Sequence, residues 1–247
     1  MSPDRTLAVV RRVLRQLRRD PRTLAMVFGI PPALLWLMDA ILTNSPGTFD
    51  RVGPLMLGFF PFMMLFVITS ISVLRERTQG TLDRLMASPI GRGDLLVGYA
   101  VAFTLVAVAQ AAVAMAVGIG MLDMPNNGGL PLTFLIVIGQ ALLGISLGLF
   151  FSAFARTEFQ AVQFLPAVVS PQFLLAGLLV PVDQLPRWLE VIARALPLTY
   201  AFEALGLIMQ EGRGLGHDRL LIDLAVLFGS VAIALAAGAL TLRRTEP

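Results

Sequence analysis

Apolar residues are grouped into six long runs, separated by short segments that hold most of the charged residues. A helix that crosses the hydrocarbon core of a bilayer needs about 20 mostly apolar residues, and each run is close to that length or longer. The predicted spans are residues 24–43, 54–74, 95–122, 131–153, 161–181 and 220–242. The pattern therefore predicts an all-α polytopic membrane protein with a single transmembrane domain over residues 1–247.

Residues 1–22 precede the first span and have an amphipathic pattern of their own. One helical face holds Leu7, Val10, Leu14 and Leu17, and arginines cover most of the rest. This pattern predicts a basic interfacial helix on the inner membrane surface, attracted by anionic lipid headgroups. Simple anchoring by positive charge is the alternative. Asp20 and Pro21 then predict the start of the next helix, as N-cap and first helical residue.

The arginines are distributed unevenly between the two sides of the predicted spans. If the N-terminus is inside, fourteen of the nineteen arginines lie on the inner side and five on the outer side. Membrane proteins carry an excess of basic residues in their cytoplasmic segments. The distribution therefore predicts that both termini are cytoplasmic.

Composition supports the membrane interpretation and excludes several classes of function. Hydrophobic residues make up 56% of the chain and charged residues 14%, and the mean hydropathy is +0.79. A soluble domain needs a more polar shell, and a disordered chain is far less apolar. Cysteine is absent and His217 is the single histidine, so disulfides, thiolate ligands and multi-histidine metal sites are excluded. The net charge of +3 is too small for a nucleic-acid partner.

Two loops carry more specific patterns, and the first is the inner loop 75–94. Leu82, Leu85 and Met86 recur at helical spacing, and Pro89 ends the pattern. A short amphipathic helix on the cytoplasmic side can seat in a groove of a partner protein. A solvated linker is the alternative.

The second informative segment is the outer stretch 182–211. One predicted helical face holds Trp188, Leu189, Ile192 and Leu196. Pro197 ends this helix, and a second apolar helix follows over residues 199–210. Neither piece is long enough to cross a bilayer, so we expect two short helices that dip in from the outer side, anchored by Trp188.

Both segments resemble the conserved motifs of ABC-2 type transporter permeases. The inner loop contains Glu76-Arg77, Gly80-Thr81-Leu82, an acidic residue, Leu85 and Ser88-Pro89. The outer segment contains Pro181, Leu185-Pro186, Trp188-Leu189 and Pro197-Leu198-Thr199-Tyr200. Arg156-Thr157 and Gln160-Ala161 before the fifth span are also similar. The chain departs from the pattern at Ala176-Gly177, where many members have Ser-Gly. The order of the motifs and the topology agree with the family over nearly the whole chain.

The resemblance implies the membrane half of an ATP-driven exporter in the bacterial plasma (inner) membrane. A permease subunit with six spans pairs with a second copy or with a similar permease to form the transport pathway. The chain contains no lysine, so it has no nucleotide-binding loop of the Gly-x-x-x-x-Gly-Lys type. We therefore expect no enzyme activity and no cofactor in this chain, with ATP and Mg bound by a separate ATP-binding-cassette subunit. The coupling helix that contacts this subunit is expected at Glu76, Gly80, Thr81, Leu82, Leu85, Met86, Ser88 and Pro89.

In the family, the second and fifth spans face the central pathway. The candidate pathway residues are Phe59, Phe62, Met63, Phe66, Gln163 and Gln172. Aromatic and methionine side chains adapt to varied apolar ligands, which favours a hydrophobic drug, antibiotic or lipid as the substrate. Internal packing or lipid contact is the alternative for each of these residues.

The outer short helices are expected to limit leakage through the pathway. The candidate gate residues are Trp188, Pro197, Tyr200 and Glu203. Glu203 has two interpretations, an ion pair with Arg194 or a place in the gate itself.

A few polar residues and glycines lie inside the predicted spans. We expect Asp39 and Asp223 to reach the outer headgroups, and Gln110 and Gln140 to form hydrogen bonds between helices. The Gly-x-x-x-Gly pattern at 144–148 indicates close helix packing.

Two other classes of function are alternatives to the exporter. An ion- or proton-coupled secondary transporter is the alternative, although such proteins tend to carry ionisable residues at mid-membrane. An intramembrane enzyme needs a convergent nucleophile and base or metal ligands, and no such cluster is visible in the sequence.

Overall fold

A computed structural model describes residues 2–78 and 92–243 of the chain, and within these ranges it contains helices and no strand. The elements are α1 (Pro3–Arg18), α2 (Pro21–Leu42), α3 (Pro46–Thr78), α5 (Arg92–Gly118), α6 (Leu130–Ser152), α7 (Glu158–Leu175), η1 (Val182–Gln184), α8 (Arg187–Ala195), α9 (Pro197–Leu205), η2 (Gly206–Gln210) and α10 (Asp218–Arg243). The prediction of an all-α polytopic membrane protein is confirmed.

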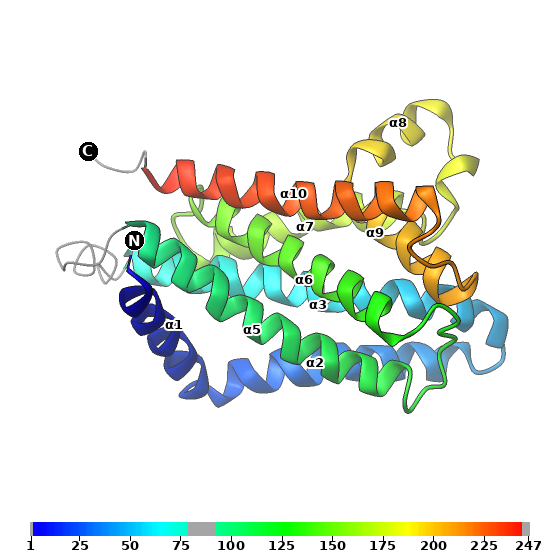
Figure 1. The fold of residues 1–247 in the computed structure, drawn as a ribbon, viewed down its shortest axis with the longest axis horizontal. Helices are drawn as coiled ribbons and strands as arrows, with labels where there is room; N and C mark the ends of the chain where they lie inside the picture. Colours follow the sequence, from blue (N-terminus) through cyan, green and yellow to red (C-terminus); the bar gives the residue numbers. More distant parts are fainter. Residues whose placement is uncertain (1, 79–91, 244–247) are drawn as a thin grey trace.

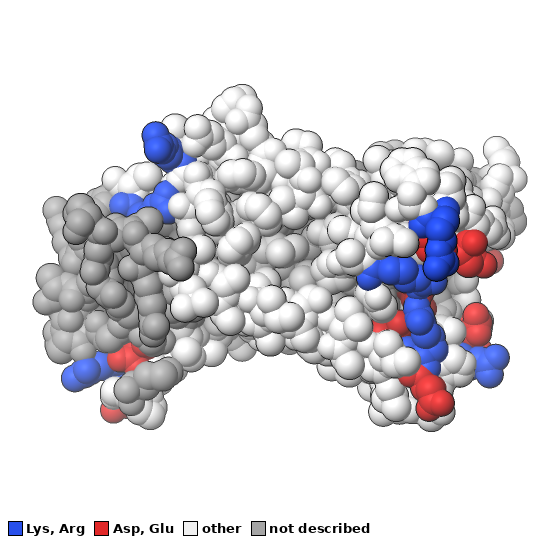
Figure 2. Space-filling model, turned by 90° about the horizontal axis from the view of Figure 1, so that it is seen from above, with Lys and Arg blue, Asp and Glu red and all other residues white. Residues whose placement is uncertain are grey.

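The long helices run side by side along one bundle (Figure 1). The arm α1 and the end of α10 lie at one end of this bundle, here called the inner end, and α8 and α9 lie at the other, the outer end (Figure 1). On the face shown in Figure 2, charged side chains gather towards the two ends, and the described surface between them shows none. An uncharged belt between two charged ends is the surface that a bilayer requires.

Among the described residues, five helices are long and apolar enough to cross a membrane, namely α2, α3, α5, α6 and α10. The bent pair of α8 and α9 with η2 would make a sixth by length and composition alone, but its two parts meet at 90°. The helix predicted as the fifth span is α7, which is shorter than predicted and ends at Leu175 rather than at Pro181. Its 18 residues include Pro166, Pro171 and three glutamines, which lower its apolarity.

α7 nevertheless carries the chain from the inner to the outer end of the bundle. At its start, Glu158 is bound by Arg75 near the inner end of α3. Towards its outer end, the Phe173 ring lies 4.8 Å from that of Phe59, which is nearer the start of α3. The two helices are therefore antiparallel neighbours, and α7 runs the length of the bundle beside α3. Gly177, with φ of 99°, follows the end of α7.

The helix starts follow local sequence chemistry. At the start of α2, the Asp20 carboxylate accepts a hydrogen bond from the Thr23 amide at 3.1 Å, and Pro21 is the first helical residue. This N-cap was predicted and is confirmed. The hydrogen bonds from the Thr23 side chain and amide hold the pKa of Asp20 below its usual value.

The arm α1 packs against the bundle. Its buried residues are Val9, Val10, Val13 and Leu17. A Cβ on Gly98 of α5 would lie 2.6 Å from the Cβ of Val9, so only glycine permits this close contact. Leu7, predicted on the apolar face, is 47% exposed. The apolar face of the arm is therefore rotated from the predicted one and is largely occupied by protein, because glycine lets α5 approach it.

The most extensive helix contact is between α3 and α6. A Cβ added at Gly144 would lie 2.2 Å from the Phe62 carbonyl oxygen, and one at Gly148 would lie 2.5 Å from that of Phe66. The predicted close packing at residues 144–148 is confirmed. The predicted hydrogen bond from Gln110 is also confirmed, since its amide nitrogen donates to the Val27 carbonyl of α2 at 2.9 Å.

The hydrogen bond predicted for Gln140 is not formed with the part of the chain that the structure describes, so this prediction is wrong. The Gln140 side chain instead occupies the space next to Gly58 of α3. A Cβ on Gly58 would overlap the Gln140 carboxamide oxygen, at 1.4 Å. The absence of a side chain at Gly58 is therefore what accommodates this buried amide.

Candidate functional site

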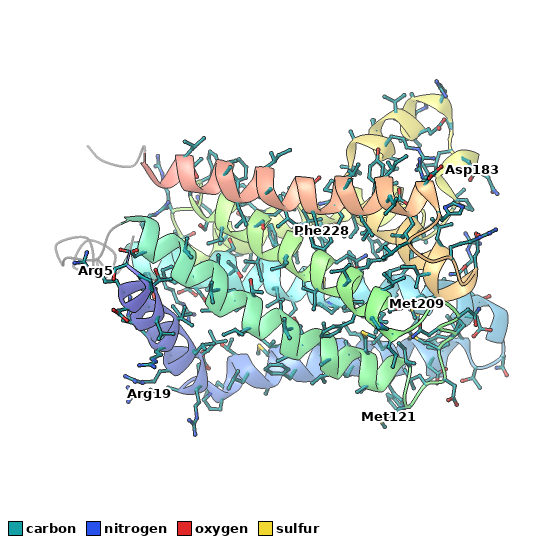
Figure 3. All side chains as sticks on the ribbon, viewed as in Figure 1. Arg5, Arg19, Met121, Asp183, Met209 and Phe228 are labelled. Atoms are coloured by element: carbon teal, nitrogen blue, oxygen red, sulfur yellow. The ribbon has the colours of Figure 1, made fainter. Side chains whose placement is uncertain are left out.

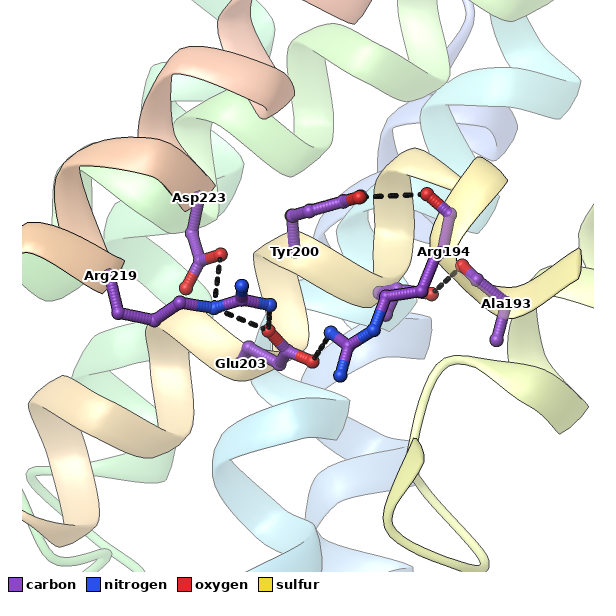
Figure 4. Close-up of polar contacts among 7 residues, drawn as sticks. Ala193, Arg194, Tyr200, Glu203, Arg219 and Asp223 are labelled. Atoms are coloured by element: carbon purple, nitrogen blue, oxygen red, sulfur yellow. Dashed lines mark hydrogen bonds and ion pairs between the residues drawn. The ribbon is translucent and has the colours of Figure 1, made fainter. Parts of the chain in front are cut away.

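The short outer helices α8 and α9 are joined by a sharp corner at Pro197. The Thr199 hydroxyl donates to the Ala193 carbonyl at 2.6 Å, and the Tyr200 hydroxyl donates to the Arg194 carbonyl at 2.8 Å (Figure 4). These carbonyls are at the end of α8, where the regular helical hydrogen bonds stop, and the Ala193 carbonyl also accepts from the Leu196 amide at 3.0 Å. The motif that includes Pro197, Thr199 and Tyr200 therefore supplies both the break and the hydrogen bonds that fix its angle.

A charged cluster links this corner to α10. Glu203 of α9 is bound by Arg194 of α8 and by Arg219 of α10, whose Nε donates to Glu203 at 3.1 Å (Figure 4). Arg219 Nε also lies 3.3 Å from Asp223 Oδ1, one turn further along α10. The guanidinium carbon of Arg219 is 5.9 Å from the centre of the Tyr200 ring. These four charged residues, Arg194, Glu203, Arg219 and Asp223, are called the outer cluster below.

The outer cluster balances two positive and two negative charges in a place that water reaches only in part. The Glu203 side chain is 24% exposed, and that of Asp223 has no exposed surface. Partly buried ion pairs are screened less than surface pairs, and removal of one partner leaves an uncompensated charge. The outer cluster therefore fastens three helices, α8, α9 and α10, to one another.

One of the two interpretations of Glu203, the ion pair with Arg194, is confirmed. The prediction that Asp223 reaches the headgroups is wrong, since the carboxylate is buried and faces Arg219. The i,i+4 spacing of Arg219 and Asp223 was visible in the sequence and would have indicated this pair. Trp188 is 67% exposed on α8.

The structure divides the six candidate pathway residues between the interior and the surface of the chain, and the rings of Phe59 and Phe62 lie 6.1 Å apart. Phe59, Phe62 and Phe66 are buried inside this single chain, at 5%, 0% and 0% exposed. Met63 is half-buried. Gln172 is buried too, and its amide nitrogen donates to the Val168 carbonyl at 3.3 Å. Only Gln163 is exposed.

Gln163 belongs to a face of α7 that the rest of the chain leaves uncovered. This exposed face is made by Gln160, Gln163, Ala167, Ser170 and Leu174, which recur at helical spacing. A shallow hollow of about 450 Å³ lies over its inner part, lined among others by Arg156, Gln160 and Gln163. The neighbouring spans expose mainly apolar side chains, so the polar groups distinguish α7 from them.

The inner end of α3 is held by a second set of polar contacts. Arg75 binds Glu158 with two hydrogen bonds, of 2.7 and 2.9 Å. Arg77 donates to the carbonyls of Ala153, at 2.8 Å, and Ala155, just after α6. These contacts fix the position from which the inner loop leaves α3.

Glu76, the one expected coupling residue that the structure describes, is 5% exposed and lies 3.3 Å from Arg12 of the arm. The Arg12–Glu76 pair joins the arm to the last turn of α3, which ends at Thr78. The other seven expected coupling residues, Gly80, Thr81, Leu82, Leu85, Met86, Ser88 and Pro89, lie outside the described residues.

These features define a polytopic helical membrane protein with a fastened outer corner and one partly polar helix face. The sequence profile of the ABC-2 type transporter family matches residues 4–209. The chain belongs to this family, as the sequence motifs indicated.

Three relatives illustrate the range of the similarity. ABC transporter G family member 20 of Dictyostelium discoideum is 29% identical over 217 residues, which is 85% of this chain and 30% of that protein. The probable multidrug ABC transporter permease YbhR of Escherichia coli K12 is 32% identical over 60% of this chain and 40% of its own length. The putative transport permease ycf38 of Cyanophora paradoxa is 27% identical over 79% of this chain and 70% of its own. The aligned parts thus cover less than half of the first two relatives.

Proposed function

We propose that this chain is the membrane permease subunit of an ABC exporter, and that two copies form an export pathway between their exposed α7 faces. The observation that carries the proposal is the presence of polar side chains on the exposed α7 face. Gln163 and Ser170 lie within the length of a helix that traverses the bundle. Polar groups at membrane depth are costly against lipid and are typical of water-filled pathways and of contacts between helices.

The energy for transport is assigned to a separate ATP-binding-cassette subunit, which binds ATP and Mg. The family membership supports a partner of this class. The inner loop after α3 is proposed as its docking element, and the paired Arg12 and Glu76 then join that loop to the arm. With the inner end of the bundle facing the cytoplasm of a bacterial cell, both termini are cytoplasmic and the outer cluster faces outwards.

The proposed substrate is a hydrophobic drug, antibiotic or lipid. The exposed α7 face combines amides and a hydroxyl with apolar positions and carries no charge between Gln160 and Leu174. Such a surface suits an apolar ligand with a few hydrogen-bonding groups. The name of the E. coli relative, a probable multidrug permease, supports the same class.

The proposed function predicts that transport depends on ATP and on a partner. Purified chain alone is expected to hydrolyse no ATP. In proteoliposomes that also hold a partner ATP-binding-cassette subunit, ATP should drive movement of a hydrophobic fluorescent dye. The matched control is the same complex with an ATPase-inactive partner. Dye movement driven by an ion gradient without ATP would instead establish a secondary transporter and overturn the proposal.

The pairing of two copies through α7 is tested by cysteine cross-linking. The chain has no native cysteine, so Gln163→Cys introduces a single thiol on the exposed α7 face. In membranes, mild oxidation or a short bis-maleimide should give a band of twice the monomer mass. Ile233→Cys is the control, because Ile233 is 72% exposed on the apolar surface of α10. Equal cross-linking of the two variants, or none for Gln163→Cys, would contradict an interface at α7.

A further inference from the structure

A cavity of about 300 Å³ lies at the inner end of the bundle, where α1 meets α2, α3 and α5. It is separate from both the α7 face and the outer cluster. We call it the arm cavity and define it by Gln16, Thr23, Met26, Val67, Glu76 and Phe103, which are part of its lining. It reaches the surface, because Gln16 is exposed and Met26 is 53% exposed.

The lining of the arm cavity changes from polar to apolar along α3. Arg75 and Glu76 lie at its inner end, and Met64 and Val67 lie deeper in the bundle. Arg75 follows Met64 by eleven positions, which corresponds to about 16 Å of helix at 1.5 Å per residue. One leaflet contributes about half of the roughly 30 Å hydrocarbon core, so the cavity is about as long as one leaflet is deep. This shape suits an amphiphile with one chain inside and its headgroup at the inner end.

Two arginines lie beside the mouth of the cavity. Arg19 and Arg22 directly precede Asp20 and Thr23, which are both part of the lining. Figure 3 shows Arg19 at the corner between α1 and α2. Both are exposed, and within residues 2–78 and 92–243 neither forms an ion pair.

The carboxylates near this mouth are already engaged. Asp20 accepts hydrogen bonds from the Thr23 amide at 3.1 Å and from the Thr23 hydroxyl at 2.6 Å. Glu76 is bound by Arg12, and the Arg75 guanidinium is bound by Glu158. The Thr23 donors are uncharged, so Asp20 keeps its negative charge, but the two positive charges of Arg19 and Arg22 outweigh it. The surplus favours an anionic headgroup, and guanidinium groups bind phosphate with paired hydrogen bonds.

We propose that the arm cavity binds one acyl chain of an anionic phospholipid from the adjoining leaflet, and that Arg19 and Arg22 bind its phosphate. The bound lipid then holds the arm to α2 and α3 at the point where Arg12 meets Glu76. This goes beyond general attraction of a basic helix to a charged surface, because it requires a chain in the cavity as well as a headgroup outside it. The proposed lipid binding does not depend on transport by the protein.

The test measures binding of phosphatidylglycerol to the purified chain in detergent by native mass spectrometry, with phosphatidylcholine and inorganic phosphate as comparison ligands. We expect the wild-type chain to bind phosphatidylglycerol about tenfold more tightly than phosphatidylcholine. The Arg19→Gln/Arg22→Gln variant should lose this preference. Arg11→Gln is the matched control, because exposed Arg11 lies on another side of α1, and it should keep the preference.

The acyl chain is tested by filling the cavity. Val67→Trp places an indole in the arm cavity and should lower the affinity for phosphatidylglycerol at least tenfold. Met26→Trp at the exposed mouth should also lower the affinity for phosphatidylglycerol. Its indole does not enter the core, so this variant replaces Val67→Trp in the test if Val67→Trp does not fold. Equal binding of the two lipids by the wild-type chain, or full affinity in Met26→Trp, would overturn the proposal. Competition by inorganic phosphate alone at the lipid's own concentration would show a headgroup site without a chain and would also overturn it.

Discussion

Replacing Gly144 with leucine is expected to separate α3 from α6 and to remove most of the stability of the folded chain. Even the first carbon of a side chain at this position would lie 2.2 Å from the Phe62 carbonyl oxygen, which is backbone and cannot rotate away. Overpacking in a core usually costs about 1–3 kcal/mol, and a clash with backbone falls at the upper end or above. For a domain of this size, about 3 kcal/mol lowers the melting temperature by roughly 6–12 °C.

The measurement is thermal unfolding of the purified chain in detergent, together with the yield of monodisperse protein. Gly144→Ala should fall between wild type and Gly144→Leu, because the methyl group alone already meets the carbonyl. Gly229→Leu on α10 is the control, since a Cβ there meets nothing within 4 Å. If Gly144→Leu and Gly229→Leu melt at the same temperature, the close contact between α3 and α6 is not what holds these helices together.

The helices themselves were predictable because each follows from a local pattern. Apolar runs of about 20 residues gave the spans, and Asp20 with Pro21 gave the start of α2. The small-residue spacing at 144–148 predicted a close helix contact, because two glycines four residues apart lie on one face of a helix, and the structure shows that the partner is α3. The resemblance supplied what no pattern in the chain states, namely the family, and the proposal of a partner subunit follows from it.

The site was less predictable, because its contacts join residues far apart in the sequence. Glu203 and Arg219 are sixteen residues apart on different helices, and Arg12 and Glu76 are 64 apart. The phenylalanines of α3 were assigned to the pathway by analogy, yet burial within one chain depends on how α3 meets α6, α7 and α9. Periodicity identifies a stripe on a helix but not the neighbour that covers it, so Phe62 and Gln163 were indistinguishable until the helices were packed.

Glu203→Gln is expected to loosen the outer corner, because it removes the carboxylate that two arginines share. The amide keeps the size of the side chain but leaves Arg194 without its carboxylate partner, while Arg219 keeps Asp223. Breaking a fully buried pair costs about 3–5 kcal/mol. Glu203 is 24% exposed and the two arginines are 33% and 39% exposed, so solvent offsets part of this and we expect about 2 kcal/mol.

Hydrogen exchange localises the effect and thermal unfolding gives its size. Amides of α8 and α9 should exchange faster in Glu203→Gln, while those of α3 and α6 should change little. The control is Glu211→Gln, because Glu211 and Arg213 are each 55% exposed and such surface pairs contribute about 0–1 kcal/mol. The Arg194→Gln/Glu203→Gln double variant should be more stable than the two separate effects predict, since it removes one of the uncompensated charges. Were Glu203→Gln and Glu211→Gln to exchange and melt alike, the outer cluster would not be the fastening of α8, α9 and α10, and the gate assigned to this corner would lose its physical basis.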